Sequence, residues 1–349
     1  TPVQVFVLEA DSGPEIVPNP VVFAAAGSGM TCAIPSDGSL WCWGSGRVGR
    51  LGMGNTDDYL SPARVMAGQW GSGSGRKRVT QVSIASNHVC AAVSDGSLWC
   101  WGATSWGRLG IGYRHYSDGD QYVPARVKAA DWGDGPSQKA ATFVATGNAH
   151  TCAILSDHSL WCWGSAHFNQ LGLGSTTPDH EFTPQRVMEA DWGTGNGRTS
   201  VHSVSTGEFH TCALLGDSTV WCWGRLAHGE TAPGTFWKQS TPQRVMPVEP
   251  YRTSDEDIVI SLSSGPHHMC AVFSGGSLWC WGQGWAGMLG TEGPATYLHT
   301  PTMLTSLSLG SSCRRNIPGM QSPALGLIVG PASRMSACVG SPAASQPRA

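Results

Sequence analysis

Charged residues are scarce in this 349-residue chain. Asp, Glu, Lys and Arg make up 13% of it, against about 25% in typical soluble domains. The formal net charge is only -3, so no excess of positive charge is present to hold nucleic acid or an acidic membrane surface. The one basic cluster, at residues 76–78, fits a solvated loop. We therefore expect no nucleic-acid partner.

Long apolar runs are also missing. The longest candidates, at residues 21–27 and 325–330, fall far short of the ~18 residues that suggest a membrane span. The chain begins without Met, and the first of these runs follows acidic rather than basic residues, which argues against a signal peptide. We expect no membrane span, and we interpret the N-terminus as a mature or truncated end.

Catalytic signatures are missing as well. The chain has no G-x-S-x-G, H-E-x-x-H, P-loop or EF-hand pattern, and its acidic residues are sparse. We therefore predict no catalytic residue, no metal site and no cofactor, and we expect that the protein is not an enzyme.

Turn residues and aromatics, in contrast, are abundant: 46 Gly, 22 Pro and 16 Trp favour an all-β fold. A unit of the form M/H-x-C-A, a short turn, then W-C-W-G occurs five times. Its first cysteines are spaced by 58, 62, 60 and 58 residues, which indicates a modular array. They are Cys32, Cys90, Cys152, Cys212 and Cys270.

Each unit predicts a β-hairpin. Apolar residues alternate on both sides of a short turn, in which Asp37 and Gly38 supply the turn chemistry of the first unit. A hairpin that is symmetric about Asp37 places Cys32 opposite Cys42, with Cα atoms roughly 4.5 Å apart, at the short edge of the disulfide range. We therefore expect a cross-strand disulfide in every hairpin: Cys32–Cys42, Cys90–Cys100, Cys152–Cys162, Cys212–Cys222 and Cys270–Cys280.

Two alternatives to disulfides stay open at this stage. The cysteines could bind a metal, because a histidine two positions before the first cysteine shares its strand face in four units; the first unit has Met30 there. Close C-x2-C knuckles are the usual zinc pattern, which makes C-x9-C a poor match. The cysteines could also be free buried thiols. The four histidines are interpreted as hydrogen-bonding residues of the repeat: His88, His150, His210 and His268.

Both faces of each small sheet are apolar. The two tryptophans of W-C-W point away from the cysteine between them, so one face is aromatic and the other carries the cysteines. Sheets that stack side by side around an axis cover both faces. Each unit then closes on a Pro and a short segment such as SPARVM at Ser61, which predicts an outer strand.

The stretch VATGNAHTCAI at Val144, followed by DHSLWCWG and NQLGLG, resembles the regulator of chromosome condensation repeat. The resemblance covers residues 1–304, and the paired cysteines resemble secreted members of that family. It implies a β-propeller of four-stranded blades, and we expect five clear repeats with partial blades at both ends.

The two ends depart from the repeat. Residues 1–11 match an outer strand of a preceding blade, and residues 305–349 are rich in Pro, Ser, Ala and Gly and lack W-C-W. The latter segment is either an irregular tail or a partial blade that completes the ring, with Cys313 bridged to Cys338. A third interpretation is that the missing blades lie outside this chain or come from another copy, by self-association.

The sequence is compatible with two functions. The first is an extracellular or cell-surface scaffold that binds a partner protein or builds a matrix or surface assembly; this follows from the resemblance and from the expected disulfides. The second is a lectin, in which loop tryptophans outside the hairpins stack on sugar rings. Those residues are Trp70, Trp132 and Trp192, whose other interpretation is that they plug the blade edge.

Overall fold

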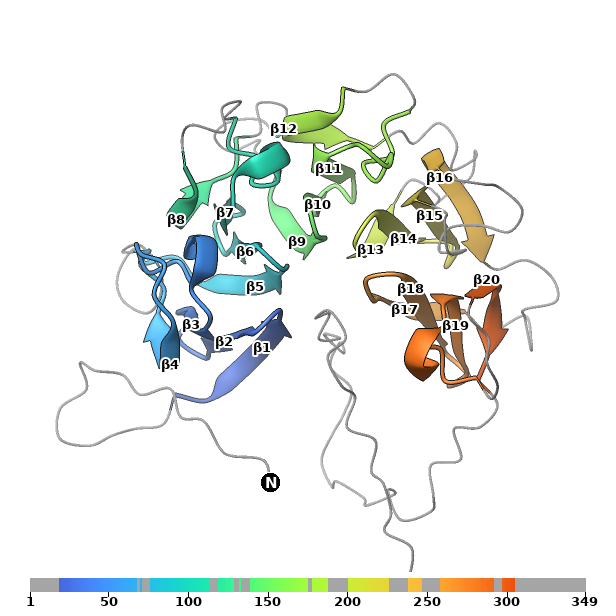
Figure 1. The fold of residues 1–349 in the computed structure, drawn as a ribbon, viewed down its shortest axis with the longest axis horizontal. Coiled ribbons are helices and arrows are strands. Elements are labelled where there is room, and N and C mark those ends of the chain that lie inside the picture. Colours follow the sequence, from blue (N-terminus) through green and yellow to red (C-terminus); the bar gives the residue numbers. More distant parts are fainter. Residues whose placement is uncertain are drawn as a thin grey trace, which may run out of the picture.

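The computed structural model contains five antiparallel sheets of four strands each, arranged side by side in an arc (Figure 1). We number them blades 1 to 5 in chain order. The structure describes residues 19–67, 70, 76–112, 119–128, 132, 139–174, 178–187, 200–225, 238–246, 258–291 and 297–304. Residues 1–18 and 305–349, including Cys313 and Cys338, lie outside the described residues.

Strand order within every blade follows the chain. Blade 1 has β1 (Val21–Gly27), β2 (Met30–Pro35), β3 (Trp41–Gly44) and β4 (Tyr59–Arg64). Blade 2 has β5 (Val79–Ile84), β6 (His88–Val93), β7 (Leu98–Gly102) and β8 (Gln121–Arg126). Blade 3 has β9 (Ala141–Thr146), β10 (His150–Leu155), β11 (Leu160–Ser165) and β12 (His180–Arg186).

Blade 4 has β13 (Val201–Thr206), β14 (His210–Leu215), β15 (Val220–Arg225) and β16 (Lys238–Met246). Blade 5 has β17 (Val259–Ser264), β18 (His268–Phe273), β19 (Leu278–Gln283) and β20 (Tyr297–Met303). The first strand of each blade lies toward the centre of the arc and the fourth lies at its periphery (Figure 1). The predicted all-β propeller fold, with its five repeats, is confirmed, and no helix among the described residues is long and apolar enough to cross a membrane.

The predicted hairpin register is confirmed in all five blades. The two cysteines of each W-C-W unit are directly paired residues of the second and third strands. Each pair forms a disulfide with 4.1 Å between the Cα atoms. This close approach is typical of cysteines placed opposite one another in antiparallel strands. Five disulfides of this kind fit an oxidising compartment.

A repeated hydrogen-bond relay holds the turn of each hairpin. In blade 3 the Asp157 carboxylate accepts the Ser159 amide at 3.1 Å and the Ser159 hydroxyl at 2.6 Å. The Ser159 oxygen in turn accepts the Trp161 indole N–H at 2.9 Å. The same relay recurs in blades 1, 2 and 4. In blade 5 Gly275 replaces the aspartate, and only the bond from Trp279 to Ser277 is formed.

The fourth strands are the predicted outer strands. Their prolines lie beside a shift in register, since Cys42 pairs with Ala63 while Gly44 pairs with Tyr59. Such an irregular edge strand accepts Pro62 because no ladder hydrogen bond is required of its missing N–H.

The core lies between the blades. The disulfide face of each blade packs on the tryptophan face of the next, as expected from the two apolar faces. At the first junction Cys32, Cys42 and Leu40 form one buried cluster with Val82 and Trp101. The same arrangement recurs at the other three junctions.

The tryptophans of the W-C-W units fall into two classes. The second tryptophan is fully buried between blades in four units, namely Trp101, Trp163, Trp223 and Trp281. The first lies at the blade edge, and Trp41, Trp99 and Trp221 are half-buried. Trp43, the second tryptophan of blade 1, is also half-buried, because the described residues include no blade packed on that face. Full burial is therefore reached only at the second position, and there in four of the five units.

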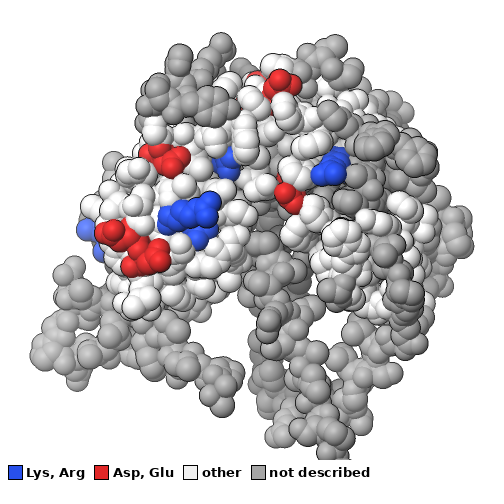
Figure 2. Space-filling model, viewed as in Figure 1, with Lys and Arg blue, Asp and Glu red and all other residues white. Residues whose placement is uncertain are grey.

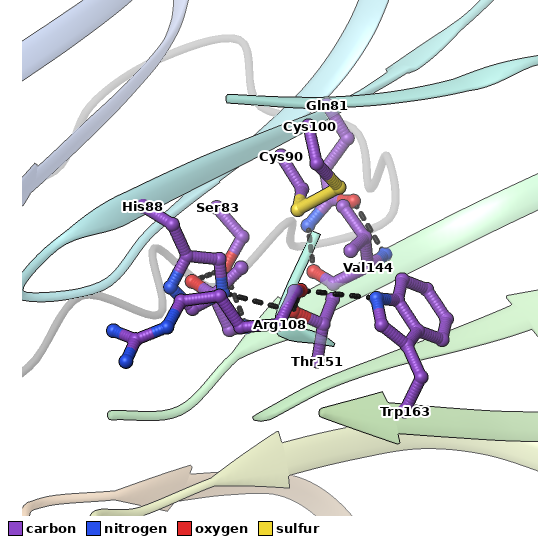
Figure 3. The surroundings of a disulfide bond; sticks show 10 residues. Gln81, Ser83, His88, Cys90, Cys100, Arg108, Val144, Thr151 and Trp163 are labelled. Atoms are coloured by element: carbon purple, nitrogen blue, oxygen red, sulfur yellow. Dashed lines mark hydrogen bonds between the residues drawn. A yellow bond between two sulfur atoms is a disulfide. The ribbon is translucent and has the colours of Figure 1, made fainter. Parts of the chain in front are cut away.

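Two of the four repeated histidines, His88 and His150, hydrogen-bond to the next blade. His88 Nε2 of blade 2 lies 2.8 Å from the Thr151 hydroxyl of blade 3, and that hydroxyl donates to the Arg108 carbonyl at 2.8 Å. Figure 3 shows this junction, in which the Trp163 indole donates to the same carbonyl. The predicted hydrogen-bonding role thus operates between blades.

Candidate functional site

One end of the propeller carries two sets of loops. The first set follows the third strands and includes three short 3-10 turns: η1 (Arg47–Gly49), η2 (Ser105–Gly107) and η6 (Trp285–Gly287). The second set joins the first and second strands, nearest the centre. The two sets touch, because Ser45 donates its amide to the Gly29 carbonyl at 3.0 Å. We call this end the loop face.

Two buried arginines hold the loop face rigid. Arg50 donates to the Ser45 carbonyl within its own loop and to the Ser86 carbonyl of the next blade. Arg108 does the same with Ser105 and with Asn148 of the next blade. Each guanidinium therefore ties a loop to its neighbour by charge-assisted hydrogen bonds.

Close packing dictates the glycine of the L-G pairs in blades 1 to 3. A Cβ atom built on Gly52 would lie 2.9 Å from Trp101 of the next blade, and one on Gly110 would lie 2.7 Å from Trp163. Any larger residue would push the two blades apart. These glycines are thus part of the scaffold, as expected.

Two tryptophan side chains stand out on the loop face because they are exposed. Trp106 is 41% exposed and Trp285 is 55% exposed. Trp106 has φ 60°, a left-handed conformation that costs free energy for a bulky residue and that clusters at functional positions. The Arg108 guanidinium lies 4.9 Å from its ring centroid. The ring is therefore held in place while one face stays open to solvent.

A second aromatic group lies between blades 3 and 4. The Phe168 and Phe209 rings are 4.6 Å apart, and the Arg225 guanidinium lies 5.3 Å from the first and 5.5 Å from the second. Both phenylalanines are half-buried. We use the name aromatic rim for the four residues Trp106, Phe168, Phe209 and Trp285.

Polar side chains surround the centre of the loop face. Glu208 of blade 4 accepts from Asn148 of blade 3 at 3.4 Å and lies 2.9 Å from His267 Nε2 of blade 5. Ser28 of blade 1 donates to Ser86 of blade 2 at 3.2 Å. These contacts join neighbouring blades at the mouth of the central channel.

The central channel is a cavity of about 920 Å³. A bulge in every first strand turns one residue out of register and exposes it, and in blades 2 to 5 that residue lines the cavity. In the middle blades this residue is polar, and in the end blades it is apolar, with Val22 66% and Ile260 55% exposed. The five positions are Val22, Thr80, Thr142, His202 and Ile260.

Electrostatics give the molecule no single-sign binding surface in the view of Figure 2, where a few separated acidic and basic side chains lie among uncharged ones. The strongest effects on titration lie inside the scaffold. Burial lowers the pKa of His150 and of His210 to about 3 and holds that of His88 well below its usual value. These three histidines are therefore neutral at neutral pH.

The structure places two of the three loop tryptophans proposed for sugar binding in the interior. Trp70 is 2% exposed, with its ring centroid 5.9 Å from that of Trp99 in an edge-to-face contact. Trp132 is 3% exposed and packs in the same way on Trp161 at 6.3 Å. Both rings fill the blade edge, so neither offers a free face for stacking. Trp192 lies outside the described residues.

Sequence reasoning missed the aromatic rim and the polar mouth. Both occupy variable positions inside the repeated frame: Trp106 replaces Val48 of the first unit, and Glu208 lies between the repeated Gly and His of the fourth. A variable residue in a repeat is one that the common fold does not need. That contrast within the chain was the available signal.

Comparison with curated proteins finds repeat relatives of low identity. The Ultraviolet-B receptor UVR8 of Arabidopsis thaliana is 28% identical over 293 residues, covering 84% of this chain and 60% of that protein. The mitochondrial RCC1 domain-containing protein RUG3 of the same plant is 26% identical over 293 residues, covering 83% and 60%. The chain thus spans about three-fifths of the length of these relatives.

Solved structures share the fold. Human WBSCR16 superposes with a TM-score of 0.67 at 19% identity, covering 82% of this chain and 67% of that chain. Prp20p of Saccharomyces cerevisiae gives 0.52 at 19% identity, covering 83% and 78%. The family model described as the RCC1-like domain matches residues 2–320. With five disulfide-stapled blades and this match over nearly its whole length, the chain belongs to the RCC1-like domain family.

Proposed function

We propose that this protein is an extracellular, non-catalytic propeller scaffold that binds a partner protein through the aromatic rim of its loop face. The observation that carries the proposal is the exposure of Trp106 and Trp285 on the loop face. Tryptophan is enriched among the residues that dominate binding energy at protein interfaces.

The turn that carries Trp106 is rigid, which supports a binding role for the exposed ring. Arg108 fixes the turn that carries Trp106 through hydrogen bonds to Ser105 and Asn148. Because the ring is held before a partner arrives, little conformational entropy is lost on association. The left-handed backbone of Trp106 recurs at Val48, the equivalent position of blade 1, and therefore belongs to the turn; the exposed aromatic ring is what distinguishes blade 2.

A protein partner fits this surface better than a nucleic acid. The loop face has scattered charges of both signs, whereas nucleic-acid surfaces are strongly basic. Among proteins of the same fold, the Prp20p structure is described together with its binding to Gsp1p and histones. From this we take only that a face of the propeller contacts a protein, and we do not assign the same partner to this chain.

An extracellular or cell-surface setting is supported by the five disulfides. Each closes an 11-residue loop that is already a hairpin, and all ten sulfurs are paired within the described residues. Cytosolic proteins rarely keep such bonds. The lectin alternative lacks support from Trp70 and Trp132, whose rings are buried, so we do not develop it.

The test uses three forms of the purified, disulfide-intact chain as bait for secreted proteins of its own source. The forms are wild type, the double variant Trp106→Ala/Trp285→Ala, and a matched control, Leu60→Ala, which removes a 98% exposed side chain from the outer strand β4. We expect a partner that wild type and Leu60→Ala retain and that the double variant loses.

Two results would contradict the proposal. One is a partner that binds all three forms equally, which would place the interface elsewhere. The other is a glycan array that labels wild type and the double variant alike, which would favour a sugar-binding site away from the rim.

A further inference from the structure

The two ends of the arc leave two unlike faces without a neighbouring blade among the described residues. On the disulfide face of blade 5, Cys270, Val272 and Leu278 are half-buried. Their counterparts at the described junctions are almost fully buried, as for Cys90, Cys152 and Cys212 at 0%. We call this surface the open face of blade 5.

The neighbouring loop is open in the same way. Met288 is 39% exposed, whereas the equivalent Arg108 is 2% exposed under the next blade. A Cβ atom on Gly287 would meet nothing within 4 Å, while one on Gly107 would meet Glu181 and Phe182 of the next blade. The open face is thus one half of the junction that occurs four times in the fold.

At each described junction, one strand of the next blade lies against the two inner strands of the preceding blade. The first strand of the next blade contacts the first two strands of the preceding one, as β9 contacts β5 and β6. One aliphatic side chain of that strand shares a buried cluster with the first cysteine of the preceding blade and with the residue two positions after it. At the last junction this is Leu262, which joins Cys212 and Leu214 in one buried cluster.

The chain itself holds a second copy of that strand's sequence. Residues 324–331, ALGLIVGP, match residues 259–266, VISLSSGP, with identical Leu, Gly and Pro at the fourth, seventh and eighth positions. In this alignment Leu327 corresponds to Leu262. No other stretch between residues 305 and 349 is as apolar.

We propose that residues 324–331 pack as an added strand on the open face of blade 5, with Leu327 between Cys270 and Val272. The connection is long enough. Residues 304–323 provide 20 residues from the end of β20, whereas 14 residues (65–78) connect β4 to β5. By contrast, the stretch at residues 305–310 follows β20 too closely to cross from an outer to a central strand, since each residue spans at most ~3.6 Å.

A second copy of the chain is a poorer occupant. Its five blades, added by the same blade-to-blade rotation, would run into blade 1 of the first copy. An intramolecular strand avoids this clash and leaves the protein a monomer.

The test is hydroxyl-radical footprinting of the full, disulfide-intact chain, read by mass spectrometry at Val272. Two valines serve as internal references: Val220, fully buried at a described junction, and Val123, 36% exposed on an outer strand. The proposal predicts that wild-type Val272 is labelled as slowly as Val220. Leu327→Asp should raise its labelling several-fold, to the level of Val123.

Leu325→Asp is the matched control. Leu325 corresponds to Ile260, which is 55% exposed in the channel, so this variant should leave Val272 protected. Unchanged labelling of Val220 shows that each variant is folded. If Leu327→Asp does not fold, Leu327→Ala replaces it in the test. Three results would overturn the proposal: Val272 labelled like Val123 in wild type, equal effects of the two Asp variants, or protection that disappears on dilution, which would indicate a second copy.

Discussion

His150 of blade 3 and Thr211 of blade 4 share a buried hydrogen bond, with 2.9 Å between Nε2 and the hydroxyl oxygen. The Thr211 hydroxyl donates onward to the Gln170 carbonyl at 2.8 Å. The histidine is fully buried, and it is neutral because burial disfavours its charged form. This relationship leads to the first two predictions.

Acid should weaken the propeller well above the range where carboxylates titrate. Burial lowers the pKa of His150 to about 3, against 6.5 for the ordinary side chain. Below pH 6.5 the unfolded chain therefore binds a proton that the folded chain does not, and stability falls as the pH drops from about 6.5 toward 3. Each such histidine contributes up to about 1.4 kcal/mol per pH unit.

Denaturant titrations at pH 7.5, 6 and 5 check this prediction. His150→Gln should lower the slope of stability against pH. Thr211→Val is the control: it weakens the junction at every pH but leaves the slope in place, because it removes no proton-binding group. Equal slopes for wild type and His150→Gln would show that this histidine does not carry the pH dependence.

The junction between blades 1 and 2 offers an apolar substitute for the His–Thr pair. It has Met30 and Val89 at the positions that His88 and Thr151 occupy at the next junction. Thr151→Val alone should lower the free energy of unfolding by about 1–3 kcal/mol, because it leaves a buried nitrogen of His88 without its hydrogen-bond partner. Adding His88→Met should recover most of that loss, as measured by thermal or chemical unfolding; a double variant that is no better than the single one would refute the pairing.

Blade 5 lacks the turn aspartate, and restoring it should stabilise the protein. Gly275→Asp can form the relay with Ser277 and Trp279 that Asp157 forms in blade 3, a gain of about 0.5–1.5 kcal/mol. Gly275→Ala separates the relay from the backbone effect of replacing glycine. The melting temperature should rise more for Gly275→Asp than for Gly275→Ala, and the reverse order would contradict the assignment.

That relay also predicts a low-pH effect. Although partial burial opposes it, hydrogen bonds from Lys139 and Ser159 lower the pKa of Asp157 to about 2. Its stabilising contribution is present above the ordinary pKa of 3.8 and is lost as the pH falls toward 2. Asp157→Asn should therefore reduce the acid sensitivity of unfolding between pH 4 and 2, and an unchanged profile would exclude this role.

The repeats made much of this fold predictable. The period of two along each strand placed Cys32 opposite Cys42 and separated the tryptophans from the cysteines, and the structure has that register. The site was less accessible. Trp70 and Trp106 both lie in loops that contain glycine and serine, yet one packs edge-to-face on Trp99 and the other is exposed. That choice depends on how an irregular loop folds back on its blade, which periodicity does not encode.

Removing one disulfide should show how much each cross-strand disulfide contributes to the free energy of unfolding. Cys152→Ala/Cys162→Ala opens an 11-residue loop, for which chain entropy predicts a loss of at most about 2.8 kcal/mol. Part of that loss is already prevented by the hairpin, so the measured change in unfolding free energy should be smaller. A loss well beyond this value would mean that the sulfurs matter chiefly for packing.

We infer that the five cysteine pairs form disulfides in an oxidising compartment. The most direct test is the intact mass of the natural protein, alkylated before and after reduction. Of its 12 cysteines, at least ten should resist alkylation until the protein is reduced. Non-reduced peptide maps should then link each pair ten positions apart, from Cys32–Cys42 to Cys270–Cys280. Alkylation of these ten cysteines without prior reduction would contradict the account.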